Sequence, residues 1–130
     1  MPNKWSYPPA NILNRVEGAF PGNYRELWEA LQAASQFPGA ELTSWYRDPA
    51  RNRGAGGAAR SSHLLGLALD LYAPNLDELA QHLREKLKNY TVSVQVEQRP
   101  PHVHVQALSA REAQSPKFLE LLRTFYPGRY

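Results

Sequence analysis

Three of the four histidines in this 130-residue chain lie in two short motifs, one of which also contains an aspartate. His63 precedes Asp70 in the segment 62–70, which reads SHLLGLALD. His102 and His104 are two residues apart in an alternating segment, which places both rings on one face of a strand, roughly 6.5–7 Å apart. Neutral imidazole and carboxylate are both ligands of divalent metals. These residue types therefore indicate a possible metal site.

The spacing of His63 and Asp70 requires a bend between them. Residues separated by an odd number of positions point to opposite faces of a continuous strand. Gly66 lies between the two and tolerates dihedral angles that other residues avoid, so we expect it to turn His63 back beside Asp70. Two histidines and a carboxylate would leave the fourth tetrahedral position open, as in catalytic zinc sites, and zinc is favoured over other divalent ions that accept the same donors.

Each of these residues also has a structural interpretation when taken alone. A lone histidine is usually a surface residue or a hydrogen-bonded core residue, and His82, which lies off the leucine stripe of its predicted helix, is interpreted in that way. An H-x-H pair can be structural, and an aspartate at the end of a strand is often a helix cap or turn residue. The joint occurrence of the two motifs favours the metal site.

Composition excludes several other kinds of site. The chain has no cysteine, which excludes disulfides, thiolate nucleophiles, iron–sulfur clusters and cysteine-containing zinc sites. The net charge of +3 is compatible with a polyanionic partner without requiring one. A basic cluster surrounds a glycine-rich segment, but aromatic residues are not interleaved with it, so we expect no nucleic-acid binding. The cluster comprises Arg47, Arg51, Arg53 and Arg60.

We expect no association with a membrane, because no apolar run approaches the ~20 residues that span a bilayer. Residues 1–6 lack the apolar core of a signal peptide, so we expect synthesis in the cytoplasm. The length indicates one domain covering residues 1–130. Prolines and a glycine interrupt its first part, and residues 1–22 are expected to form an extended arm.

Hydrophobic spacing predicts the elements that position the motifs. The predicted helices extend from Tyr24 to near Pro38, from residue 76 with Asn75 as N-cap, and from Pro116 after Ser115. The predicted strands cover residues 41–47, 67–72, 91–98 and 102–108. Residues 48–62 contain Pro49 and three glycines and are expected to be irregular. The last two strands are too close for a crossover and should be antiparallel, so the expected fold is α+β, a small antiparallel sheet covered by helices.

The motifs resemble those of the zinc D-Ala-D-Ala carboxypeptidase family. The resemblance rests on SWYRDP at 44–49, Asn52, Gly56-Gly57, the S-x-H-x-x-G-x-A-x-D element at 62–70 and HVHV at 102–105. That family includes phage endolysins and vancomycin-resistance dipeptidases, and it shares its metal core with lysostaphin-type enzymes and the hedgehog signalling domain. The resemblance is strongest over residues 42–72, and the H-x-H strand completes it.

The resemblance implies a role for each motif residue. His63, Asp70 and His104 would hold one Zn²⁺ ion. His102 would lie beside the metal and hydrogen-bond the substrate or the tetrahedral intermediate. Arg47 would bind the scissile carbonyl oxygen or a substrate carboxylate, as its planar donor fork permits, and Ser62 and Tyr46 would contact the substrate.

Glu97 is the candidate general base, because it lies on the polar face of its predicted strand. In the family, the acid lies a few positions before the last zinc histidine, whereas Glu97 is seven residues before His104 with Arg99, Pro100 and Pro101 between them. Either the Pro-Pro turn brings Glu97 to the metal, or the site binds zinc but hydrolyses poorly. The structural alternative is an exposed strand residue paired with Arg99.

The resemblance implies a zinc metallopeptidase that acts on peptidoglycan stem peptides or other peptides containing D-amino acids, as a D,D-carboxypeptidase or an endopeptidase of the phage lysin type. A monomer that acts at the cell wall is expected. The alternative is a zinc-stabilised binding module on the same scaffold with little or no turnover, as hedgehog-type domains illustrate.

Overall fold

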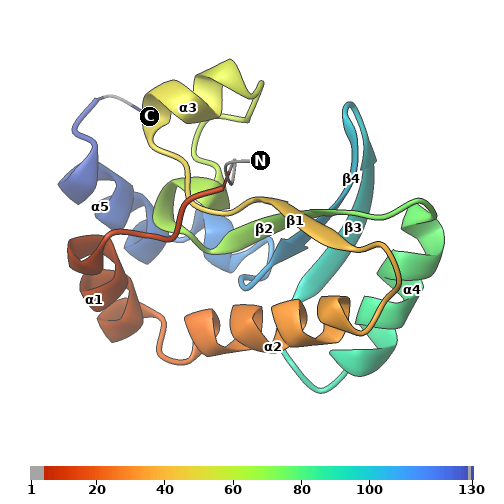
Figure 1. The fold of residues 1–130 in the computed structure, drawn as a ribbon. Coiled ribbons are helices and arrows are strands. Elements are labelled where there is room, and N and C mark those ends of the chain that lie inside the picture. The colour runs from red at the N-terminus through yellow and green to blue at the C-terminus, as the bar shows by residue number, and fades with distance from the viewer. Residues whose placement is uncertain (1–4, 129) are drawn as a thin grey trace.

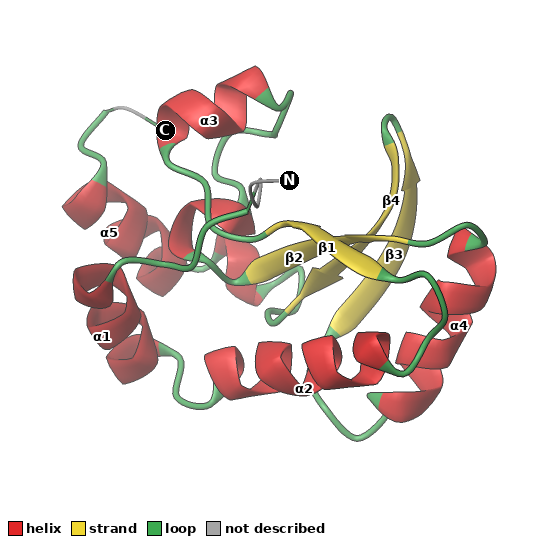
Figure 2. Ribbon diagram, viewed as in Figure 1, coloured by secondary structure: helices red, strands yellow, loops and turns green. Residues whose placement is uncertain are grey.

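A four-stranded antiparallel sheet forms the centre of the computed structural model, which describes residues 5–128 and 130 (Figures 1 and 2). The strand order is β1-β2-β4-β3. The strands are β1 (Glu41–Ser44), β2 (Ala68–Tyr72), β3 (Ser93–Gln98) and β4 (Pro101–Gln106). β3 and β4 form an antiparallel hairpin in which Gln98 pairs with Pro101. The α+β class and the antiparallel pairing of the last two strands are thus confirmed.

Helices surround this sheet (Figure 2). The helix expected from Tyr24 is α2 (Asn23–Ser35), the one after Asn75 is α4 (Leu76–Lys86), and the one after Ser115 is α5 (Pro116–Phe125). Both expected caps are present: the Asn75 side chain accepts from the Glu78 N–H, and the Ser115 hydroxyl accepts from the Phe118 N–H. Two 3₁₀ helices, η1 (Ser62–Leu65) and η2 (Glu112–Gln114), complete these elements.

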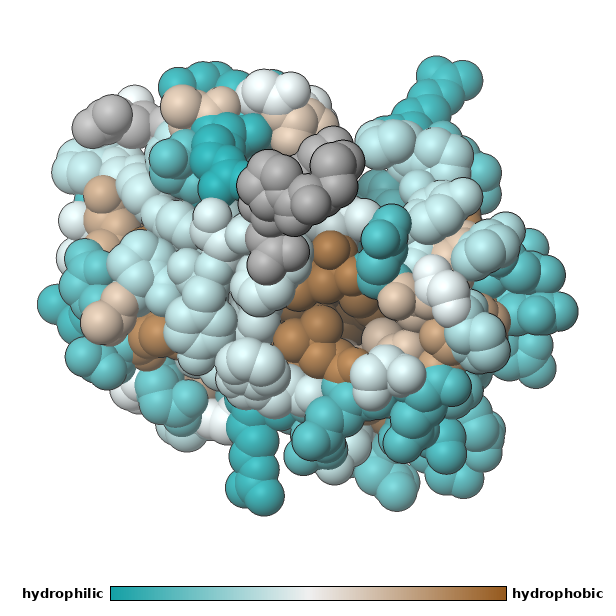
Figure 3. Space-filling model, viewed as in Figure 1, coloured by the Kyte–Doolittle hydropathy of each residue, from teal (hydrophilic) through white to brown (hydrophobic). Residues whose placement is uncertain are grey.

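The two faces of the sheet differ in polarity. Leu69 and Leu71 of β2 and Val103 and Val105 of β4 are buried on one face, towards the side where α2 and α4 pack. The opposite face carries the alternate polar residues, because successive side chains of a strand point to opposite sides. The view in Figure 3 is mostly hydrophilic, with hydrophobic surface gathered in a hollow between the sheet and α2.

Two regions that were expected to be irregular contain helices. Within the expected arm, residues 10–19 form α1 (Ala10–Ala19), whose Ile12 and Val16 are buried. Pro9 occupies the N-cap position, where a proline is tolerated because no helical N–H is lost there. Residues 1–4 of the arm lie outside the described residues. Within 48–62, α3 (Pro49–Gly54) begins at Asp48, whose carboxylate accepts from the Arg51 N–H.

The first predicted strand is shorter than expected. β1 ends at Ser44, and Tyr46 instead forms an isolated antiparallel bridge with Ser6. In the described part of the chain, no helix is long and apolar enough to cross a membrane.

α1 and α5 both contact η1, the turn that carries His63, and they lie next to one another at one end of the molecule (Figure 1). Gly66 ends this turn with φ +70°, a left-handed conformation that favours glycine. A Cβ on Gly66 would overlap Cγ and Cβ of Pro8. The expected bend at Gly66 is therefore confirmed, and it leaves no room for a side chain.

Replacing Gly66 with alanine should lower the free energy of unfolding by about 2 kcal/mol, from the left-handed strain and the contact with Pro8. Gly18→Ala is the control, because Gly18 lies in α1 and a Cβ added there would have no neighbouring atom within 4 Å. That variant should be more stable by about 0.5–1 kcal/mol. Urea denaturation measures both, and equal midpoints for the two variants would contradict the role given to Gly66.

Candidate metal centre

The carboxylate of Asp70 is the point at which the histidines meet. Its Oδ1 lies 3.1 Å from Nε2 of His63, 3.2 Å from Nδ1 of His104 and 3.5 Å from Nε2 of His102. The sheet register explains this convergence, since Asp70 of β2 pairs directly with His104 of β4. Opposed residues of antiparallel strands project from the same face. The two motifs, distant in the sequence, thus form one cluster.

His63 reaches this cluster from η1 rather than from a strand. Its Nδ1 lies 2.6 Å from the carbonyl oxygen of Trp45. Because a carbonyl only accepts, Nδ1 carries the proton and donates it, and in the neutral ring Nε2 presents its lone pair to Asp70. The His63 residue is only 2% exposed, so its ring has little access to solvent.

The charges of the cluster suit a metal ion. Burial lowers the pKa of His63 below its ordinary value, which favours the neutral ligand form. Burial alone would raise the pKa of Asp70, but the hydrogen bonds that His104 and His63 donate to it when protonated, and the charges of the histidines, hold this pKa well below its usual range. An ionised carboxylate and a neutral imidazole are the protonation states that bind metal.

The donor set also fits. Within the described residues, His63, Asp70 and His104 are the group that offers three ligand atoms within 4.8 Å of one another. The lone pair of His63 Nε2 faces an oxygen of the Asp70 carboxylate, and two such acceptors need a cation between them. Two imidazole nitrogens and one carboxylate oxygen match the three-ligand sets of catalytic zinc sites.

Arg47 holds the other oxygen of the same carboxylate. Its Nη2 donates to Asp70 Oδ2 at 2.5 Å, Nε donates to Ser44 Oγ at 2.9 Å, and Nη1 donates to Asn52 Oδ1 at 3.3 Å. The buried Asn52 is in turn enclosed by the glycine-rich loop, where a Cβ on Gly57 would overlap Asn52 Oδ1. Arg47 therefore orients Asp70 within the cluster, and its contact with substrate remains a prediction.

Glu97 and His102 approach from the β3–β4 hairpin. The two residues pair directly in the register, so both side chains lie on the face that carries His104 and Asp70. The residues Arg99 and Pro100 form a two-residue turn, which places Glu97 across the hairpin despite its separation from His104 in sequence. The predicted parity of Glu97 is thus confirmed, and its role as base remains a prediction.

A cavity of about 1130 Å³ opens over this cluster. Of the residues predicted to act in the site, it is lined by Arg47, Ser62, His63, Asp70, Glu97, His102 and His104.

Tyr46 does not join the residues that line the cavity. Its hydroxyl lies 2.6 Å from the hydroxyl of Tyr126, which donates to the Leu64 carbonyl at 2.9 Å. The structure therefore does not support the expected substrate contact of Tyr46, because its hydroxyl is hydrogen-bonded to Tyr126, the residue that follows α5. Tyr72, which is 41% exposed, lines the cavity instead.

Sequence reasoning missed Gln106, which also lines the cavity and contacts His104. Its position two residues after His104 places it on the same strand face, and that parity was the one available signal. Glutamine is not a usual zinc ligand, so its residue type does not mark it as part of a zinc site.

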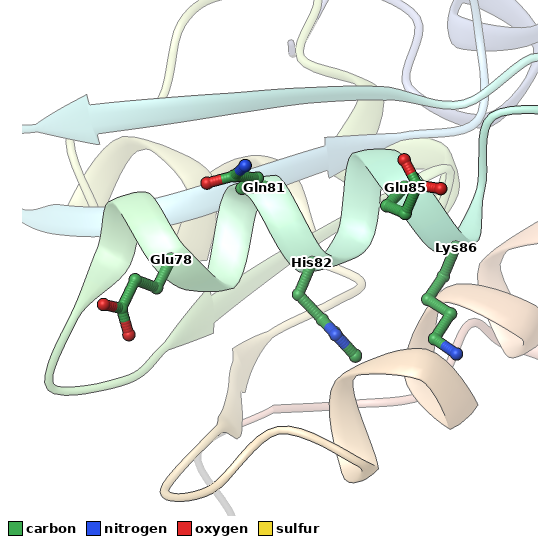
Figure 4. A pocket seen from close by; sticks show the side chains of 5 residues that line it. All are labelled: Glu78, Gln81, His82, Glu85 and Lys86. Atoms are coloured by element: carbon green, nitrogen blue, oxygen red, sulfur yellow. The ribbon is translucent and has the colours of Figure 1, made fainter.

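His82 lies in a separate hollow along α4, lined by residues of that helix (Figure 4). Its side chain points towards α2, where Nε2 donates to the Ala33 carbonyl at 2.8 Å. The ring also packs against Phe37, at 5.5 Å between centroids. The interpretation of His82 as a satisfied structural histidine is confirmed.

Replacing Asp70 with asparagine should weaken zinc binding by more than about 100-fold, beyond the loss typical of residues that only support a ligand. The metal-free variant should also lose about 3 kcal/mol of stability, because Arg47 is left largely buried without its charge partner. Chelator competition and urea denaturation measure the two effects. Asp77→Asn, an exposed position in the first turn of α4, should change neither appreciably.

Zinc affinity should fall as the pH falls from about 8 to about 6. Burial alone would lower the pKa of His104, but its hydrogen bond to Asp70 and the charges of Asp70 and Glu97 raise it above its ordinary value. Protons therefore compete with metal for this ring at higher pH than for an ordinary imidazole, by up to about tenfold per pH unit for each proton displaced. Titration calorimetry at several pH values measures the slope. His82→Gln should leave it unchanged, and a flat profile would contradict the assignment of His104.

A sequence model of the family described as Peptidase M15 matches residues 12–106. The matched region contains the whole cluster around Asp70, from Arg47 to His104. Comparisons with curated proteins and with solved structures found no match. Since the match covers more than half of the chain, the chain belongs to the peptidase M15 family, whose members are zinc-dependent metallopeptidases.

Proposed function

We propose that this member of the peptidase M15 family hydrolyses peptide bonds of peptidoglycan stem peptides, as a D,D-carboxypeptidase or an endopeptidase. The observation that carries the proposal is that the three ligand-type residues share one open cavity with the candidate base Glu97 and with His102 and Arg47. The cell wall would then be the place of action.

His63, Asp70 and His104 would hold the zinc ion. When bound, zinc supplies Lewis-acid activation of a water molecule and polarisation of the scissile carbonyl. The side chains that surround these three ligands suggest how protons move during the reaction.

The Glu97 carboxylate is suited to accept the proton of the attacking water. It is exposed on the cavity side of β3, and its negative charge contributes to the raised pKa of His104, which supports its closeness to the ligands. Once protonated, the same carboxyl group can donate that proton to the departing amine.

His102 and Arg47 are suited to stabilise the oxyanion. Nδ1 of His102 donates to the Pro100 carbonyl at 2.6 Å, which holds the ring with Nε2 towards the cluster, 3.5 Å from Asp70 Oδ1. Arg47 uses three of its five N–H groups on Asp70, Ser44 and Asn52, which leaves two for a substrate oxygen.

The charge of the cavity supports an anionic peptide as substrate. Among the described residues that line it, arginines outnumber carboxylates: Arg47, Arg51, Arg60 and Arg99 stand against Asp70 and Glu97. With Asp70 already paired to Arg47, the charges of Arg60 and Arg99 exceed that of Glu97, which favours a peptide that carries free carboxylates.

Replacing Glu97 with glutamine should reduce turnover at least about 100-fold, because the amide cannot accept the proton of the water. Zinc-loaded protein is incubated with purified peptidoglycan and with a D-Ala-D-Ala-terminated peptide, and new amines and released D-alanine are followed. Zinc stoichiometry should stay at one ion per chain in the variant. Glu85→Gln, an exposed carboxylate on α4, is the matched control and should keep full activity.

The two substrates separate the candidate reactions. Release of D-alanine supports a carboxypeptidase, whereas new amines from peptidoglycan without D-alanine support an endopeptidase. Stoichiometric zinc with no turnover on either substrate would overturn the proposed peptidase and favour the binding module.

A further inference from the structure

Gln106 lies on β4 two residues after His104, and both ends of its amide are engaged. Its Nε2 donates to the Leu108 carbonyl at 3.0 Å. Because that carbonyl only accepts, the amide nitrogen must face Leu108, and the amide oxygen must face the other way. Oε1 is thereby aimed at Ser62 Oγ, 2.9 Å away, and at His104 Nε2, 3.3 Å away.

This contact determines which nitrogen of His104 carries a proton. Oε1 of Gln106 only accepts, so Nε2 of His104 donates to it and Nδ1 presents its lone pair to Asp70 Oδ1. His63 is held in the opposite sense, with Nδ1 donating to Trp45 and Nε2 facing Asp70. The two histidines therefore offer different ring nitrogens to one position.

We propose that Gln106 is a positioning residue that fixes the tautomer and the ring orientation of His104 for metal binding. The inference rests on the proposed metal-dependent function. Groups that hydrogen-bond the second nitrogen of a metal-ligating histidine set its tautomer and raise its affinity for metal. Gln106 is such a group, and it is itself held at a fixed orientation by Leu108.

Ser62 extends this arrangement to the other histidine. It immediately precedes His63 in η1, is only 5% exposed, and donates its hydroxyl proton to the oxygen that His104 also uses. One amide oxygen thus joins the turn that carries His63 to the strand that carries His104. The donated hydrogen bond gives Ser62 a positioning role, and its contact with substrate remains a prediction.

The test compares Gln106→Leu, which keeps a similar volume without an acceptor, with Gln106→Glu, which keeps an acceptor. Zinc Kd is measured by chelator competition. Gln106→Leu should bind zinc about 10–100-fold more weakly, whereas Gln106→Glu should stay within about threefold of the parent. Gln95→Leu is the matched control, because Gln95 pairs with His104 in the register but is exposed on β3, and it should bind zinc as the parent does.

A second readout reports the ring nitrogen directly. In protein loaded with ¹¹³Cd, a histidine bound through Nε2 shows cadmium coupling to both Hε1 and Hδ2, and one bound through Nδ1 shows coupling to Hε1 alone. The parent should show one ring of each kind, with His104 coupled through Hε1 only. Gln106→Leu should lose this single pattern, while a residue that only stabilised the fold would leave it intact.

The outcomes separate this inference from the proposed function. A parent that binds one cadmium ion in the expected pattern but hydrolyses no stem peptide would overturn the function and support the inference. Gln106→Leu protein with unchanged zinc Kd and an unchanged coupling pattern would overturn the inference, whatever the turnover. Gln106→Glu binding as weakly as Gln106→Leu would also overturn it, because an acceptor would then not be what His104 needs.

Discussion

The largely buried charge of Asp70 is the constraint on which the rest of the site depends. A carboxylate with little access to water is unfavourable unless charges and donors surround it. Here one oxygen faces three histidines and the other is held by Arg47. The pairing of β2 with β4 brings His104 to it, and the left-handed turn at Gly66 brings His63. The register and the turn thus bring both histidine ligands of the candidate site to one buried carboxylate.

The two faces of the sheet have different roles, one in stability and the other in chemistry. The apolar face packs with α2 and α4 and fixes the strand positions, while the polar face carries the metal-type residues and opens into the cavity. Two candidate ligands, His63 and Asp70, come from η1 and β2, whereas His104 comes from the β3–β4 hairpin together with Glu97 and His102. One hairpin therefore supplies both the third candidate ligand and the candidate general base.

The sequence was most informative where chemistry depends on local spacing. The parity of His102 and His104, the odd separation of His63 from Asp70 and the glycine between them led to the observed cluster, and the parity of Glu97 led to its face. Spacing does not predict α1, because Pro9 precedes this helix rather than interrupting it. It does not predict α3, because Pro49 and the glycines of residues 48–62 indicate irregular structure, whereas Pro49 begins a short helix that Asp48 caps. Gln106 and Tyr46 could not be assigned from spacing, because their partners Ser62 and Tyr126 are remote in the sequence and only tertiary packing brings them together.

The contact made by the hydroxyl of Tyr126 limits where the chain could be truncated. This hydroxyl donates to the Leu64 carbonyl in η1, and the preceding helix, α5, packs against the same turn. Both Tyr126 and α5 lie beyond residue 106, where the family match ends. The stretch that carries the family motifs is therefore shorter than the stretch that must fold together. A fragment trimmed to the matched residues would retain every candidate ligand and lose the C-terminal support of the turn that presents His63.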